Sequence, residues 1–199
     1  MYADFPYIKD KIGSNGKERR ILSNAFDKLP VFTVSQNKNS IAILGRENSM
    51  RLYKWIDEKY IVKNSSFDSY KVIVPTTGPG TLYDKTSNTI IGMPIIGTPN
   101  MGYTQTFISL GAFNTKKNEA EACCKYIKTK FARTLIGAVK ITQDIKPKIW
   151  RFVPLQDFTS CSDIDWSKTI PEIDQQLYRK YGFSQKEIDY IETHIQEMS

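Results

Sequence analysis

Five basic side chains lie close together in residues 125–140, and clustered lysines and arginines are the groups that bind phosphates and other anions. Only one acid, Asp144, accompanies them in the stretch KYIKTKFARTLIGAVKITQD. Apolar residues recur there every three or four positions, which is the spacing of an amphipathic helix. We therefore predict that one face of this helix packs on a core while its neighbouring face meets an anion. The basic residues are Lys125, Lys128, Lys130, Arg133 and Lys140.

A basic face that is merely solvated is the alternative interpretation of this pattern, and the residues alone leave it open. It explains the apolar stripe but not the excess of positive charge over the whole chain. The 199 residues include 28 Lys and Arg against 21 Asp and Glu, a formal net charge of +7. Such an excess favours nucleic acid or another polyanion as the partner.

One long helix over 115–137 is predicted to position these residues. Asn114 or Thr115 is a suitable N-cap, and Gly137 is a plausible end. The apolar stripe that would face the core consists of Ala120, Cys124, Ile127, Phe131 and Leu135.

Around this helix the sequence predicts one mixed α/β domain of the α+β class over residues 31–199, preceded by an irregular N-terminal arm over 1–30. A twisted, mixed or mostly antiparallel central sheet is expected, with a C-terminal pair of helices. Two capping boxes, Thr169 with Glu172 and Ser184 with Glu187, start that pair. A helix over 50–60 is also predicted. Strands are predicted at 31–34, 41–44, 70–74, within 89–111, and at 149–153.

Several kinds of site are disfavoured by composition. His194 is the only histidine, and the adjacent Cys123 and Cys124 are two of only three cysteines. A zinc site or a Ser-His-Asp site is therefore disfavoured, because the sequence holds too few of the side chains that such sites require. No phosphate-binding glycine motif follows a strand. The start of the chain lacks the apolar core of a signal peptide, and no apolar run is long enough to span a membrane. A chain without membrane contact, in the reducing cytoplasm, is the expectation.

Much of the chain resembles the C-terminal region of bacterial restriction–modification N6-adenine DNA methyltransferases. The resemblance spans nearly the whole sequence and is most specific from residue 150 onward. It is carried by GSNGKERRILSNAFDKLP, AILGRENSMRLYKWIDEKYIVKN, YTQTFISLGAFNTKKNEAEACCKYIKTKFARTLIGAVKITQD, WRFVPLQDFT, SDIDWSKTIPEIDQQLYRKYGFS and EIDYIE.

The resemblance implies a target-recognition domain for double-stranded DNA, separated from its catalytic domain. The family's catalytic half binds S-adenosylmethionine and holds adenine with an Asn/Asp-Pro-Pro-Tyr/Phe motif. Neither feature is found here, because Asn100 follows Pro99 rather than preceding a proline pair. The chain itself is therefore expected to hold no cofactor and no catalytic residue, Met1 would begin a fragment, and a methyltransferase catalytic domain or subunit is the expected protein partner. The parent would methylate DNA and could also cut it.

For such a domain, the basic residues of 125–140 are predicted to contact phosphates, while amides and hydroxyls read base edges. A whole methyltransferase or nuclease whose motif is not evident remains an alternative, as does a protein-interaction module or a specificity subunit that docks on a methyltransferase or restriction complex. The candidates nearer the bases are Thr142, Gln143, Thr104, Gln105, Thr106 and the loop 75–88, and Lys71 completes the predicted DNA-binding set.

Overall fold

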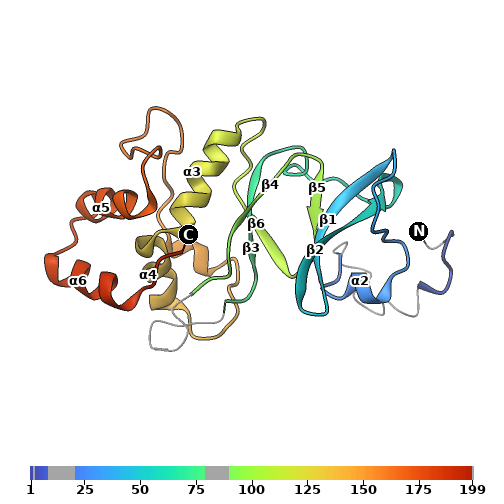
Figure 1. Cartoon of the computed structure of the whole chain (residues 1–199), viewed down its shortest axis with the longest axis horizontal. Coiled ribbons are helices and arrows are strands. Elements are labelled where there is room, and N and C mark those ends of the chain that lie inside the picture. The colour runs from blue at the N-terminus through green and yellow to red at the C-terminus, as the bar shows by residue number, and fades with distance from the viewer. Residues whose placement is uncertain (2, 9–20, 79–89, 199) are drawn as a thin grey trace.

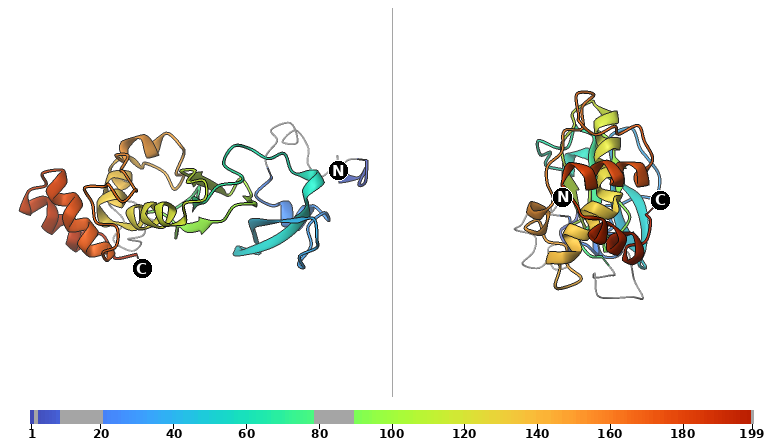
Figure 2. Two further views of the ribbon diagram at one scale, coloured as in Figure 1. Left: turned by 90° about the horizontal axis from the view of Figure 1, so that it is seen from above. Right: turned by 90° about the vertical axis from the view of Figure 1, so that its left-hand side faces the viewer.

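The protein consists of two three-stranded sheets that face each other, with helices beyond the second sheet (Figure 1). The computed structural model describes residues 1, 3–8, 21–78 and 90–198. The molecule is elongated: the first sheet and the N-terminus lie at one end, the second sheet is central, and the C-terminal helices lie at the other end (Figures 1 and 2). The predicted α+β class is confirmed, although two sheets take the place of one central sheet.

The first sheet has the order β2-β1-β5, in which β1 (Ser40–Glu47) and β2 (Met50–Asp57) form an antiparallel hairpin. Asn48 and Ser49 form its two-residue turn, and both have positive φ, 49° and 65°, as a tight hairpin turn requires. The short strand β5 (Met101–Tyr103) pairs with β1 in parallel.

The helix predicted over 50–60 is wrong, because these residues form β2 and the short 3₁₀ helix η2 (Glu58–Tyr60). Leu52, Trp55 and Ile56 do follow a helical spacing. However, cross-strand pairing with the apolar run of β1 satisfies both the backbone and the side chains, and such tertiary pairing overrides a short local pattern.

The second sheet has the order β4-β3-β6, and all its pairs are antiparallel. Its strands are β3 (Lys71–Pro75), β4 (Ile95–Gly97) and β6 (Phe107–Leu110). Every residue of β3 is buried. The two sheets meet through a small apolar cluster of four buried side chains: Leu44, Ile73, Met101 and Phe107.

The N-terminal residues are not an arm outside the core where the structure describes them. A separate apolar cluster forms between β1, β2 and the residues before them, including the short helix α2 (Ala25–Lys28). Ile8 and Ala25 are fully buried in it. Residues 9–20 of the predicted arm lie outside the described residues. Of the predicted strand at 31–34, only Thr33 pairs, in a single bridge with Trp55.

The long helix predicted over 115–137 is two helices, α3 (Lys117–Lys128) and α4 (Lys130–Val139). Thr129 breaks it with an extended conformation, φ −57° and ψ 148°, and its hydroxyl accepts a hydrogen bond from the Ala132 N–H at 3.1 Å. The predicted apolar stripe is nevertheless largely buried. Cys124, Ile127 and Phe131 belong to the largest core cluster, Leu135 packs against it, and Ala120 is fully buried.

Beyond these helices lies the predicted C-terminal pair, α5 (Ile170–Lys180) and α6 (Gln185–His194), and both predicted capping boxes are confirmed. Residues 149–153 are not a strand: the 3₁₀ helix η3 (Ile149–Phe152) occupies this position. Among the residues that the structure describes, no helix has the length and apolar character needed to cross a membrane.

A buried carboxylate links the two halves of the broken helix to the C-terminal pair. Asp174 of α5 is 1 % exposed and accepts hydrogen bonds from the first N–H groups of α4, those of Lys130 (3.0 Å) and Phe131 (2.8 Å). These donors have no partner within α4, so Asp174 acts as its N-cap from another element.

We expect Asp174→Ala to lower the free energy of unfolding by about 2–4 kcal/mol, because two buried N–H groups lose their acceptor. Urea denaturation measures the change. The matched control is Asp163→Ala, which removes an acid whose pair with Lys180 is on the surface and should cost at most about 1 kcal/mol. Equal losses for the two variants would contradict the capping role.

Candidate nucleic-acid interface

Four of the predicted DNA-binding cations are buried, and none of the four is placed to meet a phosphate in this structure. Their exposed fractions are at most 8 %, and each donates hydrogen bonds to backbone carbonyls of the same chain. The prediction that these side chains form a surface for phosphates is therefore corrected. The four residues are Lys71, Lys130, Arg133 and Lys140.

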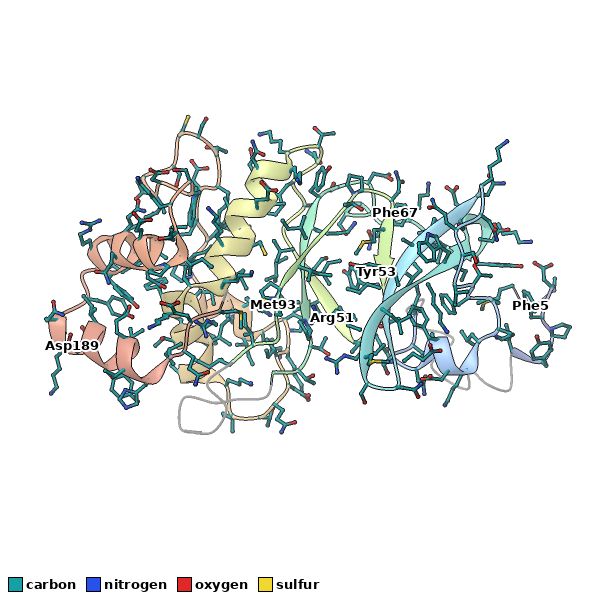
Figure 3. All side chains as sticks on the ribbon, in the orientation of Figure 1. Phe5, Arg51, Tyr53, Phe67, Met93 and Asp189 are labelled. Carbon is teal, nitrogen blue, oxygen red and sulfur yellow. The ribbon has the colours of Figure 1, made fainter. Side chains whose placement is uncertain are left out.

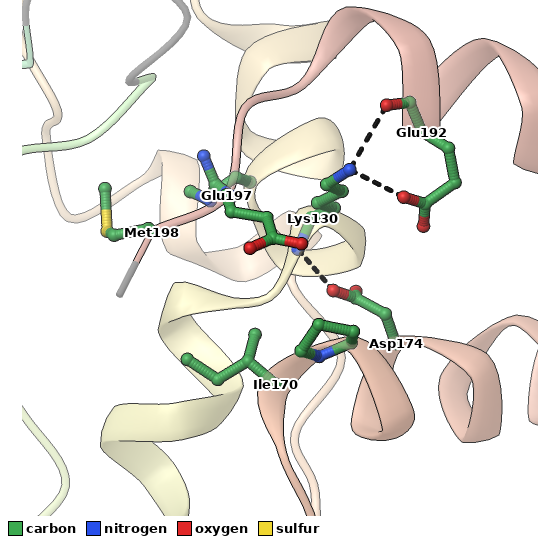
Figure 4. Close-up of a pocket in the computed structure, with 8 residues that line it drawn as sticks. Lys130, Ile170, Asp174, Glu192, Glu197 and Met198 are labelled. Carbon is green, nitrogen blue, oxygen red and sulfur yellow. Dashed lines mark hydrogen bonds and ion pairs between the residues drawn. The ribbon is translucent and has the colours of Figure 1, made fainter.

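Lys130 and Arg133 hold the C-terminal segment against α4. The ammonium of Lys130 donates to the Glu192 carboxylate at 2.6 Å and to the Glu192 carbonyl at 3.1 Å (Figure 4). The Arg133 guanidinium donates to the carbonyls of Lys128 (3.0 Å) and Gln196 (2.5 Å). Together with Asp174 these residues line a small pocket of about 180 Å³ between α4, α5 and the chain end. In this pocket Lys130 is paired with Glu192, whereas Nη1 of Arg133 is buried without a hydrogen-bond partner among the described residues.

Lys140 and Lys71 each hold irregular segments in place through hydrogen bonds to backbone carbonyls. Lys140 donates to the carbonyls of Gly78 and Ile90, both at 2.8 Å. Lys71 donates to the carbonyls of Ser66 (2.9 Å) and Phe67 (3.0 Å), and burial lowers its pKa to about 8. Both ammonium groups replace water with backbone acceptors, as a buried cation must.

The remaining two predicted cations are partly exposed. Lys125 donates to the carbonyls of Trp166 and Lys168, both at 2.9 Å, so it ties α3 to the start of α5. Lys128 is half-buried at the end of α3. Of the cations predicted to contact phosphates, Lys128 is thus the one for which that prediction still stands.

The predicted base-reading segments, in contrast, lie beside one another. The Thr76 N–H and hydroxyl both donate to the carbonyl of Thr106, at 2.9 and 3.0 Å. The next residues pair with the third segment: Thr77 forms a bridge with Asp144, and the Gly78 N–H donates to the Gln143 carbonyl at 2.9 Å. Segments 104–106, 76–78 and 142–145 therefore form one surface, which we call the three-segment surface. Residues 79–88 of the predicted loop lie outside the described residues.

Side chains on this surface differ in how accessible they are. Thr142 and Gln143 are exposed, whereas Gln105 and Thr106 are half-buried. Thr104 is fully buried, and its hydroxyl donates to that of Thr106 at 3.1 Å. Thr104 therefore positions its neighbours. The exposed pair offers the Gln143 amide and the Thr142 hydroxyl, which accepts a hydrogen bond from the Asp144 N–H at 3.3 Å and can still donate.

A cleft of about 850 Å³ adjoins the three-segment surface. One wall is polar and comes from that surface, with Thr76, Gln105 and Asp144. The opposite wall is mostly apolar and belongs to the N-terminal cluster, with Phe32 and Ile61 among its residues. A mostly apolar cleft with a few polar groups is the usual form of a binding site.

Two exposed lysines at the margin of this surface were not singled out from the sequence. Lys146 lines the cleft and Lys148 follows it, with Arg151 exposed one 3₁₀ turn later. The run Lys146-Pro147-Lys148 contains a signal that could have found them: a proline in an irregular segment keeps its neighbours out of helices and on the surface. The three-segment surface together with Lys146 and Lys148 can donate to phosphates and pair with base edges.

The two adjacent cysteines of α3 are not activated as nucleophiles. Cys123 and Cys124 are buried, and burial raises the pKa of the Cys123 thiol to about 12, so it stays protonated and unreactive. Within the described part of the chain, no group of three or more His, Cys, Asp or Glu side chains is arranged to hold a metal ion.

Comparison with known proteins returned no match of any kind. No family model matches the chain, and neither a curated protein nor a solved structure is significantly similar to it.

The buried Asp174 gives this region a measurable pH dependence. Burial raises its pKa to about 6, against the opposing effect of its two N–H donors. Because the folded-state pKa lies above the ordinary value of 3.8, folding takes up a proton, and the stability that comes from this proton uptake is lost as the pH rises through about 6.

We expect the free energy of unfolding of the wild type, relative to Asp174→Asn, to fall by about 2 kcal/mol between pH 4 and pH 7. Urea denaturation of both proteins across this range isolates the effect, because all other titrating groups are shared. A constant difference would show that Asp174 titrates at its ordinary pKa.

Proposed function

We propose that this chain recognises a short site in double-stranded DNA through the three-segment surface, as the target-recognition domain of a cytoplasmic adenine-N6 methyltransferase. The observation that carries the proposal is the convergence of three separately predicted polar segments, beside which Lys146 and Lys148 are exposed. The net charge of +7 and the family resemblance of the sequence support it.

The division of labour on this surface follows from the chemistry of its groups. Lys146 and Lys148 would neutralise phosphates and supply the salt-dependent part of the affinity. Gln143 can pair with adenine through its amide, and Thr142 can donate a hydrogen bond or touch a thymine methyl group. Each correct base contact would contribute about 1–3 kcal/mol of discrimination. Methyl transfer, with S-adenosylmethionine, would take place in the separate catalytic domain after the adenine is flipped out.

A protein-interaction role is the second candidate, and a different observation favours it. Ile141 and Leu155 are each 93 % exposed and Phe152 is 54 % exposed, although all three are large apolar side chains on one segment of the chain. All three lie within residues 141–155, and exposed apolar side chains mark a protein interface where they form a contiguous patch. A methyltransferase catalytic domain or subunit is the partner that this role would require.

DNA binding can be tested by fluorescence anisotropy of a labelled random-sequence duplex titrated with the chain at several salt concentrations. We expect affinity to fall linearly in log[salt]. In Lys146→Glu/Lys148→Glu the slope should become shallower by about 2, because each lost phosphate contact removes about 0.9.

Lys168→Glu/Lys186→Glu is the matched control, since both lysines are exposed on the helical end of the molecule and the change in net charge is the same. It should keep most of the slope. Absence of binding at low salt, or equal losses in both double variants, would refute recognition by the three-segment surface and favour the interaction role.

A further inference from the structure

Two arginines lie directly opposite each other across the β1–β2 hairpin. Arg46 and Arg51 are Cα partners in the antiparallel register, one pair away from the Asn48-Ser49 turn. Partners in such a register project from the same face of the sheet, so the two guanidinium groups are neighbours. Like charges in this position destabilise a sheet unless something compensates them.

The described part of the chain offers no such compensation. Neither arginine forms an ion pair there, and the adjacent carboxylate of Glu47 is taken by Lys54 at 2.5 Å. The Nε of Arg46 is buried without a hydrogen-bond partner. Burial lowers the pKa of Arg51, and the charge of Arg46 lowers it further. The two like charges therefore lie close together at a cost in folding stability, and at least one of their N–H donors lacks an acceptor among the described residues.

Contacts with the second sheet and with Met93 hold Arg51 in position. Arg51 donates to the carbonyl of Met93 at 3.1 Å, and its guanidinium lies 5.4 Å from the centre of the Phe107 ring. Figure 3 shows Arg51 and Met93 together at the junction of the two sheets. Because the second sheet fixes Arg51, little side-chain freedom remains to be lost when a ligand binds.

An aromatic side chain extends this basic site. Tyr53 lies two residues after Arg51 on the same face of β2, is 42 % exposed, and is close enough for the Arg51 charge to affect its pKa. Met93, whose carbonyl accepts the hydrogen bond from Arg51, is also exposed. Adjacent guanidinium groups match a phosphate, and an exposed ring can stack on a base.

We propose that Arg46 and Arg51 bind the phosphate of a nucleotide, with the Tyr53 ring beside its base. None of these three residues lines the cleft. They lie on β1 and on β2, the edge strand of the first sheet on the side away from β5. The inference does not depend on the three-segment surface. The nucleotide could be free or part of a nucleic-acid strand, since both present the same groups.

Thermal unfolding of the full chain tests this site with two probes, deoxyadenosine monophosphate and a twelve-residue thymidine oligonucleotide. Each is compared with sodium chloride at equal ionic strength. At a saturating concentration we expect the unfolding temperature of the wild type to rise by about 2–4 °C. A rise with both probes indicates a site for free nucleotides, and a rise with the oligonucleotide alone indicates a site for a strand.

Arg46→Met should abolish this rise. Without a probe it should unfold at the wild-type temperature or above, because the repulsion with Arg51 is gone, whereas a purely structural arginine would leave it less stable. Arg46→Gln serves the same purpose if the methionine variant does not fold. Arg179→Met, at an exposed arginine of α5, is the control and should keep the rise.

Three outcomes would overturn the proposal: no rise in the wild type beyond that in chloride, a rise that survives in Arg46→Met and Arg46→Gln, or an equal loss in Arg179→Met. Lys146→Glu/Lys148→Glu separates the two sites. If it loses duplex affinity but keeps the nucleotide-dependent rise, the arginine site stands independently of the proposed function.

Discussion

Packing of the two sheets against each other is the contact on which the rest of the molecule depends. Strand β1 is central to it, because Leu44 points toward the second sheet while Ile43 points into the N-terminal cluster, and both are fully buried. With three strands each in the described part of the chain, both sheets need a covered apolar face to be stable. Two sites lie at the borders of this contact: the cleft with its polar wall, and the arginine pair. The geometry of both sites therefore depends on how the two sheets pack.

Burial of cations is the second organising feature. Lys71, Lys130, Arg133 and Lys140 all bring a charge into the interior, where carbonyl oxygens and one carboxylate replace water. A removed acceptor would leave a costly unpaired charge, so these contacts fix loops and the chain end strongly. The surface charge that a partner encounters is consequently set by other residues, such as Lys146.

The sequence predicted those features that depend on neighbours along the chain. Both C-terminal helices and the β3 strand follow from capping boxes and a β-branched run, and the burial of the stripe around Phe131 follows from its period. Pairing between distant segments was beyond local patterns: it turned residues 50–57 into a strand, and the carboxylate of Asp174 allowed a helix to restart after Thr129. The candidate site shows the same division. Residues 142–143 are exposed as loop residues should be, but no spacing could reveal that Arg133 turns inward to meet the carbonyl of Gln196.

Lys140 has a consequence for how this protein can vary. By donating to the carbonyls of both Gly78 and Ile90, it fastens two points of the chain that are twelve positions apart. Loss of the Lys140 side chain would leave two buried carbonyls without this donor, which costs more than the loss of a surface contact. A substitution at position 140 would therefore loosen three places together: the residues after β3, the residues before β4 and the end of α4.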